Sequence, residues 1–361
     1  MKFEIETDRS KKNKQQRYKQ KIYLLIICFI VVSFLILLIT YLILESGNKK
    51  KQQMPVSTPK VIEKETKKEE TEIKLYNEDS NDRPIAFIID NGITDVNYAG
   101  LQSSFLNYEI LTDDKQTKIM SIYKDRNVNL IGPIQSINNY FLDYALESDA
   151  IVAYYGSTQQ AEKDIKDLNI NSINGKVNKD PFRRDDKSKS PHNVFTNIEY
   201  IKDYLNNTEF SKTSNTWKLL NLSKEEINIE NGKTAKKITI PYSTDEYRSY
   251  MYDETNKYYL RSQNGSAHID RQSNKQLHYK NVIVLKVETK KSENEEKNEL
   301  KTIGTGTGYY ITNGQSEEIT WSKETRSSKS VYKYKDGTEL KLNDGNTFIH
   351  IIPIEKNITI E

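Results

Sequence analysis

Cysteine is nearly absent from this chain of 361 residues. The single cysteine, Cys28, lies inside a continuous apolar run, so the polar remainder forms no disulfide and offers no thiol nucleophile or cysteine-based zinc site. Lipid attachment needs a small residue just before the cysteine, and Cys28 follows Ile27. Lipoprotein processing is therefore not expected here.

Histidine and glycine are also scarce, with 4 and 14 residues. The histidines form no H-x-x-x-H or H-E-x-x-H arrangement, so we expect no zinc site, and nothing indicates a cofactor. The run Gly304-Thr-Gly-Thr-Gly308 resembles a phosphate loop, but its spacing is G-x-G-x-G and a tyrosine-rich strand follows it. We therefore predict a bulge or turn there.

The chain also lacks an excess of charge of either sign. The chain has 54 basic and 51 acidic residues, and residues 45–361 alone are close to neutral. A protein that binds nucleic acid through its phosphates usually presents a strong basic field. Nucleic acid is therefore not an expected partner.

The dominant feature is Ile22–Leu44, 23 residues without charge, proline or glycine. As a helix it spans about 34 Å, enough for a hydrocarbon core of about 30 Å. Signal-peptide cores are shorter and end at small residues. The pattern predicts an uncleaved transmembrane helix in the lipid bilayer. More basic residues precede it (seven, Arg9 to Lys21) than follow it, which favours a cytoplasmic N-terminus in a single-pass plasma-membrane protein.

The remaining chain divides by composition. The predicted parts are a basic cytoplasmic tail (1–21), the transmembrane helix (22–44), a disordered linker (45–80), an N-terminal α/β domain (81–206), an inter-domain connection (207–235) and a β-rich C-terminal domain (236–361). The fold class is α+β, with a mostly antiparallel C-terminal domain and both domains extracytoplasmic.

Apolar runs and periodicity place the elements of the first domain. Strands are expected at 84–90, 118–123 and 149–155, helices at 136–147, 158–168 and 196–206, and a helix or helix–strand element at 99–110. From Lys236 the apolar period changes to two, and Asn-Gly and Asp-Gly turns appear. The expected strands are 237–242, 247–252, 258–261, 282–288, 308–312, 317–321, 331–334 and 347–352.

Several stretches resemble the YerB-like lipoprotein family of bacterial envelope proteins, whose domains have no known activity. They are RPIAFIIDN (83–91), YEI (108–110), IGPIQS (131–136), RRDDKSKSPHN (183–193), RSQNGSAHIDRQSNKQL (261–277), KNVIVLKV (280–287), GTGTGYY (304–310), EITWSK (318–323) and DGTELKLNDGNTFIHIIP (336–353). The resemblance implies an N-terminal α/β domain and a β-rich C-terminal domain outside the membrane. Family members usually begin with a lipobox cysteine, which the apolar helix replaces here. They also commonly carry a basic Arg-Ser-Ala-Arg run, whose arginines correspond to Gln135 and Asn138.

The densest polar constellation is Arg183-Arg184-Asp185-Asp186 with Pro191-His192-Asn193. In a functional interpretation His192 is a base or ligand, Asp185 or Asp186 orients it, and Arg183, Arg184 and Asn193 hold an anion. In the structural interpretation these residues form a charge-paired loop, and His192 and Asn193 cap the following helix.

Asp90 and Glu109 end apolar runs and are candidates for paired catalytic carboxylates. The alternative is that Asp90 caps a turn and Glu109 is exposed to solvent. His268 and Asp270 lie two apart on an extended segment, so they share one face, which is at best half of a metal or acid–base site. The tyrosines between Tyr242 and Tyr259 either stack on wall sugars or pack half-buried, as strand tyrosines usually do.

Two functions are compatible with these residues. The first is a membrane-anchored binding or scaffolding module for peptidoglycan, other cell-wall material or an envelope protein. The alternative is an envelope hydrolase of glycan or peptide bonds that uses Asp90, Glu109, Asp185 and His192. No catalytic signature decides whether the protein is an enzyme, although the absence of one favours the binding module.

Overall fold

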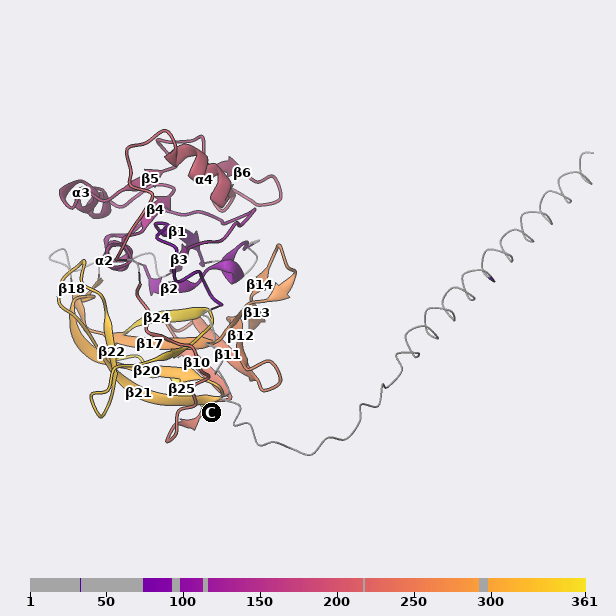
Figure 1. Cartoon of the computed structure of the whole chain (residues 1–361), viewed down its shortest axis with the longest axis vertical. Helices are drawn as coiled ribbons and strands as arrows, with labels where there is room; N and C mark the ends of the chain where they lie inside the picture. Colours follow the sequence, from indigo (N-terminus) through magenta and orange to yellow (C-terminus); the bar gives the residue numbers. More distant parts are fainter. Residues whose placement is uncertain (1–32, 34–73, 93–97, 113–115, 217, 292–297) are drawn as a thin grey trace, which may run out of the picture. The chain divides into compact units, whose positions relative to one another are not determined.

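A computed structural model describes Ser33 and residues 74–92, 98–112, 116–216, 218–291 and 298–361. Residues 69–361 form one compact unit. This unit is rich in β-structure, and its helices are few and short (Figure 1).

The first half of the unit contains most of its helical structure. Its elements are β1 (Ile85–Asp90), η1 (Leu101–Ser103), β2 (Leu106–Leu111), β3 (Thr117–Tyr123), α2 (Asn139–Glu147), β4 (Ile151–Tyr154), α3 (Gln159–Asp167), β5 (Ser172–Asn174), β6 (Arg183–Arg184), β7 (Val194–Phe195) and α4 (Ile198–Leu205). Helices α3 and α4 begin where the side chains of Thr158 and Asn197 accept backbone N–H bonds, as N-cap residues do.

The second half consists of strands within the described residues. They are β8 (Leu222–Ser223), β9 (Lys233–Thr234), β10 (Lys237–Pro241), β11 (Tyr247–Asp253), β12 (Tyr258–Gln263), β13 (Ser266–Ala267), β14 (Ile269–Asp270), β15 (Lys275–Gln276), β16 (His278–Tyr279), β17 (Asn281–Val287), β18 (Thr289–Lys291), β19 (Asn298–Leu300), β20 (Gly304–Thr312), β21 (Gln315–Lys323), β22 (Val331–Tyr334), β23 (Leu342–Asn343), β24 (Thr347–Pro353) and β25 (Thr359–Ile360).

One eleven-stranded sheet runs through both halves. Its order is β22-β21-β20-β17-β24-β2-β3-β1-β4-β5, and β9 adds to β21. The halves join where β24 pairs in parallel with β2 on one side and with β17 on the other. The predicted division at 207–235 remains a prediction, and strands from both sides of it share this sheet.

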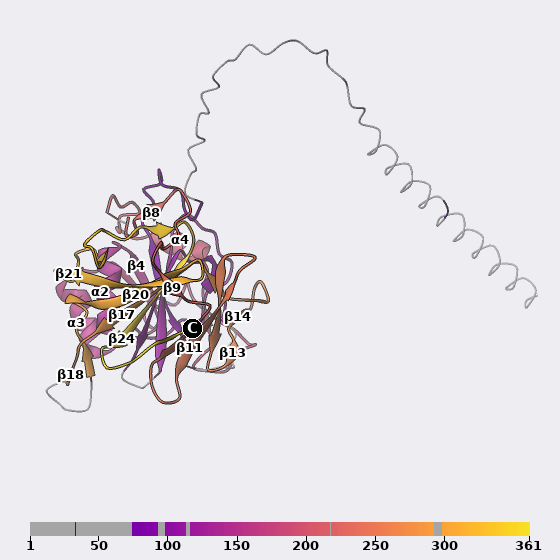
Figure 2. The same cartoon turned by 90° about the horizontal axis from the view of Figure 1, so that it is seen from below.

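Two hydrophobic cores lie on opposite faces of the large sheet. One contains residues of α2 and α3, and the other contains residues of α4 and of a smaller sheet built on β10, β11 and β12. Seen from below, α2 and α3 lie on one side of β17 and β24, and β13 and β14 lie on the other (Figure 2). Because both faces are covered, β1 and β24 are apolar along almost their whole length.

The strands and helices expected from apolar runs are found, with small shifts at their ends. The segment 99–110 is a single 3-10 turn followed by β2, so the helix–strand alternative was right. The prediction of a bulge or turn at Gly304–Gly308 is wrong, because these residues lie within β20, paired with β21. Gly306 is needed there because a Cβ at this position would lie 2.7 Å from the Lys286 carbonyl oxygen.

No helix within the described ranges is long and apolar enough to cross a membrane. Except for Ser33, the predicted span Ile22–Leu44 lies outside the described residues.

Replacing Gly308 tests the close contact between β20 and β17. A Cβ at this position would collide with the carbonyl oxygen of Val284. We expect Gly308→Ala to lower the free energy of unfolding of residues 69–361 by about 1–3 kcal/mol in urea denaturation. Thr307→Ala, at an exposed position of the same strand, is the control and should have little effect. Equal stability of the two variants would contradict this packing.

Candidate functional site

Polar side chains gather at the carboxyl ends of β1 and β4. These strands are parallel, so the loops that follow them lie at one edge of the sheet, where α/β proteins commonly bind ligands. The segment 131–137 inserts between the two ends: Gln135 N donates to Ile88 O at 2.8 Å, and Tyr155 N donates to Gln135 O at 2.9 Å. We call the polar surface formed here by Asp90, Tyr155, Arg183, Arg184, His192 and Asn193 the carboxyl-edge site.

The β6–β7 ribbon brings the loop 185–193 to this edge. Val194 and Phe195 are buried, and Ile134 N donates to Val194 O at 2.7 Å. Gly132, at φ +149°, allows the close approach, since a Cβ there would lie 2.8 Å from the Phe195 ring. The apolar residues of the ribbon thus dock on the core, whereas Arg184 lies over Tyr155 just after β4 and Arg183 lies over Tyr200 of α4.

Asp90 and His192 are in direct contact through Asp90 Oδ2 and His192 Nδ1. The side chain of Asp90 is 3% exposed and that of His192 is 19% exposed. Asp90 also accepts bonds from Gln135 Nε2 at 3.3 Å and from Gly92 N at 3.1 Å. The carboxylate beside His192 is therefore Asp90, and the expectation that Asp185 or Asp186 fills this role is wrong.

Asp185 instead pairs with Arg271 across the two halves of the unit. Arg271 donates from both terminal nitrogens, at 2.7 and 3.1 Å, and its guanidinium lies 5.5 Å above the Phe195 ring. This hydrogen bonding from Arg271 lowers the pKa of Asp185. The carboxylate is thus a structural partner that ties the β14–β15 hairpin to the loop.

The two exposed arginines of the site each lie over a tyrosine. Arg184 donates to Asn193 Oδ1 at 2.6 Å, and its guanidinium lies 5.7 Å from the centre of the Tyr155 ring. Arg183 lies 4.8 Å from the centre of the Tyr200 ring. Stacking on an aromatic ring holds a guanidinium in place while its edge stays available to an anion.

Glu109 lies in the interior, and the expectation that it is exposed to solvent is wrong. Its carboxylate accepts bonds from Arg248 Nε at 2.6 Å, Arg261 Nη2 at 2.7 Å and Asn91 Nδ2 at 2.6 Å. Burial alone would raise the pKa of Glu109, but Arg248 and Arg261 outweigh it and hold this pKa well below its usual range. Glu109 is ionised at neutral pH and is no general acid.

Two buried histidines complete this interior network. His268 Nδ1 accepts a bond from Arg261, and its ring packs edge-on against Tyr98 with the centroids 4.4 Å apart. His350 lies between Tyr242, 2.8 Å from Nδ1, and Tyr250, 2.7 Å from Nε2. Burial lowers the pKa of both rings, that of His350 to about 3, so both are neutral.

Asp270 is also buried but has a different role from His268, although the two lie only two residues apart in the chain. It accepts backbone bonds from Gly100 N at 2.9 Å, Gln272 N at 2.9 Å and Ser273 N at 3.2 Å. It fixes the hairpin turn and anchors η1. No group of three or more metal-binding side chains occurs among the residues described.

The structure therefore divides the candidate residues among separate groups and does not bring them all together in one site. Asp90 meets His192, Arg184 meets Asn193, Asp185 meets Arg271, and Glu109 and His268 share the interior network. Sequence reasoning missed Arg248, Arg261 and His350. The sequence does carry a signal for the two arginines, because alternate residues of a strand face the same side. Arg248 therefore shares a face of β11 with the buried Tyr250, and Arg261 shares a face of β12 with the buried Tyr259.

Comparison with known proteins identifies the chain by family. Residues 71–211 match the family described as "Protein of unknown function (DUF3048) N-terminal domain", and residues 238–349 match the corresponding C-terminal domain. The chain belongs to this two-domain family, as its resemblance to YerB-like proteins implied.

A relative and a solved structure agree with this assignment. The chain is 23% identical over 287 residues to the Bacillus subtilis (strain 168) protein named "Putative lipoprotein YerB", covering 78% of this chain and 85% of the relative. The crystal structure of YerB from Bacillus subtilis superposes with a TM-score of 0.68 at 24% identity, covering 77% of this chain and 94% of that one. The fold described above is therefore shared with YerB.

Removing the carboxylate of Glu109 should destabilise the whole unit. Glu109→Gln leaves the buried guanidinium of Arg261 without a counter-charge and leaves Arg248 with Glu246 as its carboxylate partner. Breaking a buried ion pair in this way typically costs roughly 3–5 kcal/mol. Urea denaturation of residues 69–361 at pH 7.5 measures this loss. Glu254→Gln, which removes an exposed carboxylate paired with Lys236, is the matched control. A Glu109 variant as stable as the control would refute the proposed role of the network.

Acid should weaken the fold through the buried histidines. In the unfolded chain His268 and His350 bind protons below about pH 6.5, whereas in the folded chain they stay neutral. Stability is therefore highest above pH 6.5 and falls as the pH drops. From pH 7.5 to 5.5 each contributes a loss of about 1.4 kcal/mol. We expect His350→Gln to lose about half of this pH dependence, and an unchanged dependence would contradict the assignment.

Proposed function

We propose that this chain is a membrane-anchored, extracytoplasmic binding module whose carboxyl-edge site recognises anionic groups of cell-wall material or of an envelope partner. The observation that carries this proposal is the pair of exposed arginines, Arg183 and Arg184, each over a tyrosine ring. A guanidinium fork matches the geometry of carboxylates and phosphates.

The charge pattern supports binding over hydrolysis. Two of the four predicted catalytic candidates, Glu109 and Asp185, are occupied by arginine partners. Ion pairs of this kind hold carboxylates ionised and fixed, which suits structure more than proton transfer. The groups left facing outward are mainly cationic, amide and aromatic.

The proposed location rests on two supports. The name of the Bacillus relative describes a lipoprotein, which supports association with a membrane. In this chain the apolar segment Ile22–Leu44 takes the place of the lipid anchor, with the N-terminus in the cytoplasm.

One observation favours a hydrolase as the second candidate. Asp90 engages Nδ1 of the partly exposed His192. An aspartate at Nδ1 leaves Nε2 as the nitrogen that exchanges protons, the arrangement of a general base. In this alternative His192 activates a water molecule for attack on a glycan or peptide bond.

Co-sedimentation of residues 69–361 with isolated sacculi tests both functions. We expect Arg183→Gln/Arg184→Gln to weaken binding by about tenfold or more, the loss of roughly 1.4 kcal/mol. Lys163→Gln/Lys166→Gln removes the same charge from the exposed face of α3 and should bind as the unaltered unit does.

The remaining outcomes separate the alternatives. Soluble fragments released by the unaltered unit and lost in His192→Ala would establish the hydrolase instead. Equal binding by both double variants would refute the assignment to the carboxyl-edge site. Absence of pelleting would exclude sacculi as the ligand and direct the search to an envelope protein.

A further inference from the structure

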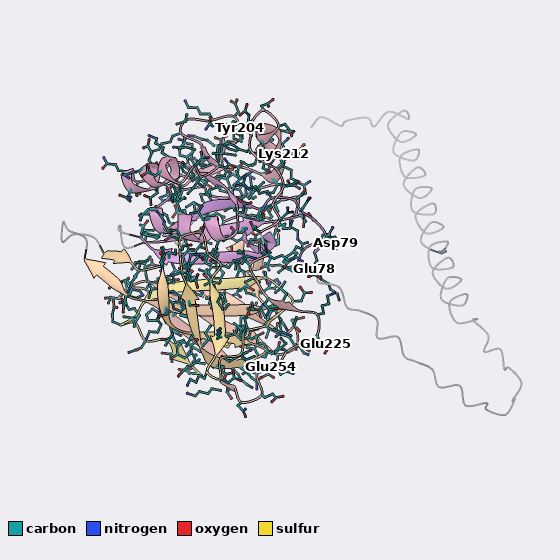
Figure 3. All side chains as sticks on the ribbon, turned by 60° about the vertical axis from the view of Figure 1, so that its left-hand side comes forward. Glu78, Asp79, Tyr204, Lys212, Glu225 and Glu254 are labelled. Atoms are coloured by element: carbon teal, nitrogen blue, oxygen red, sulfur yellow. The ribbon has the colours of Figure 1, made fainter. Side chains whose placement is uncertain are left out.

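A cavity of about 490 Å³ lies away from the carboxyl-edge site. Four segments line it: 74–75, 102–104, 126–128 and 344–346. Three of them come from the first half of the unit and one from the second, so the cavity lies at the seam between the halves. Glu78 and Asp79, which follow the lining segment 74–75 in the chain, project from the surface at this seam (Figure 3). Its volume is typical of a small-molecule site.

The lining segment 74–75, which forms one wall of the cavity, is held in place by hydrogen bonds from both halves. The carboxylate of Asp344 accepts Lys74 N at 2.8 Å and Leu75 N at 3.2 Å. Arg126 Nη2 donates to Leu75 O at 2.7 Å. The wall that includes Lys74 is therefore fixed before any ligand arrives.

The floor is equally well fixed. Gln102 forms two bonds with the backbone of His278, donating from Nε2 and accepting at Oε1, both at 2.9 Å. Ser104 Oγ donates to Leu101 O at 2.8 Å. The neighbouring Ser103 is exposed at the cavity, so its hydroxyl is presented from a rigid turn.

The side chains that line the cavity indicate the chemical class of its ligand. Two cations, Lys74 and Arg126, border the cavity, and the carboxylate of Asp344 already accepts two backbone N–H groups. Ser103 and Asn127 add a hydroxyl and an amide, and both side chains are exposed. Arginine and lysine together suit a phosphate, and hydroxyl and amide groups suit the hydroxyls of a polyol.

We propose that this cavity binds a polyol phosphate, with the phosphate on Arg126 and Lys74 and the polyol hydroxyls on Ser103 and Asn127. This site is additional to the carboxyl-edge site and does not depend on the function proposed for it. The polyol phosphate is either free in solution or part of a lipid head group, since the same groups recognise both.

Calorimetric titration of residues 69–361 with sn-glycerol 3-phosphate tests the site. Both cores and every strand pairing described above lie within these residues, so the unit carries its own fold. We expect Arg126→Gln to raise the dissociation constant by about tenfold or more. Lys163→Gln, a charge-matched change on α3, and Arg183→Gln/Arg184→Gln should leave it unchanged. Inorganic phosphate should bind more weakly, because it has no polyol hydroxyls.

A second variant tests the site without changing any charge, and a separate measurement checks that both variants are folded. Ser103→Phe fills the cavity from an exposed position without altering any charge, and it should also abolish binding. Circular dichroism checks that each variant is folded. Calorimetric binding that is unchanged in either variant overturns the proposal, and so does the absence of binding by the unaltered unit both here and to the vesicles described next.

Sedimentation with phosphatidylglycerol vesicles, against phosphatidylcholine vesicles, distinguishes the two sources. Selective binding that Arg126→Gln abolishes assigns the site to a lipid head group. Calorimetric binding without selective vesicle binding assigns it to a soluble polyol phosphate. Vesicle binding that survives in both Arg126→Gln and Ser103→Phe, with no calorimetric signal, overturns the site.

Discussion

The ion pairs of Glu109 with Arg248 and Arg261 hold the layers of this fold in register. Glu109 lies on β2 of the large sheet, whereas Arg248 and Arg261 lie on β11 and β12 of the small sheet. Burying three charges is expensive, and these ion pairs, together with the bonds of Arg248 to Glu246 and Thr117, offset the cost. A shift of either sheet by one residue would place these charges in the apolar core. The network therefore determines how the two sheets pack as well as stabilising their packing.

The same network positions the carboxyl-edge site. Asn91 donates to Glu109 in the interior, and the preceding residue, the buried Asp90, contacts the partly exposed His192. A buried electrostatic arrangement thereby fixes the end of β1 on which the surface pair depends. The salt bridge of Asp185 with Arg271 holds the opposite side of the loop. The site is therefore built by both halves of the unit, although its polar groups come from the first half.

The sequence predicts local features of this fold well and distant pairings poorly. The apolar run 347–352 located β24 (Thr347–Pro353) nearly to the residue, because burial on both faces leaves a clear pattern. The edge strand Val331–Tyr334, which is only partly buried, was located by its β-favouring valine and tyrosines. Nothing in a single sequence indicates that Asp90 and His192, 102 residues apart, are in contact. The glycines of β20 were misread, because the close backbone approach that requires them comes from β17, a separate strand. Glu109 was misplaced for the same reason: its arginine partners lie more than 130 residues away.

The position of β24 has a consequence for biogenesis. This strand, residues 347–353, is inserted between β2 and β17 near the middle of the large sheet, so the sheet cannot close until almost the whole chain is present. Such long-range pairing folds slowly and leaves β2 and β17 with open edges in the meantime. A chain exported from its N-terminus would therefore emerge with an incomplete sheet and finish folding only after its last strands had crossed. Its vulnerability to proteolysis and aggregation is concentrated in that interval.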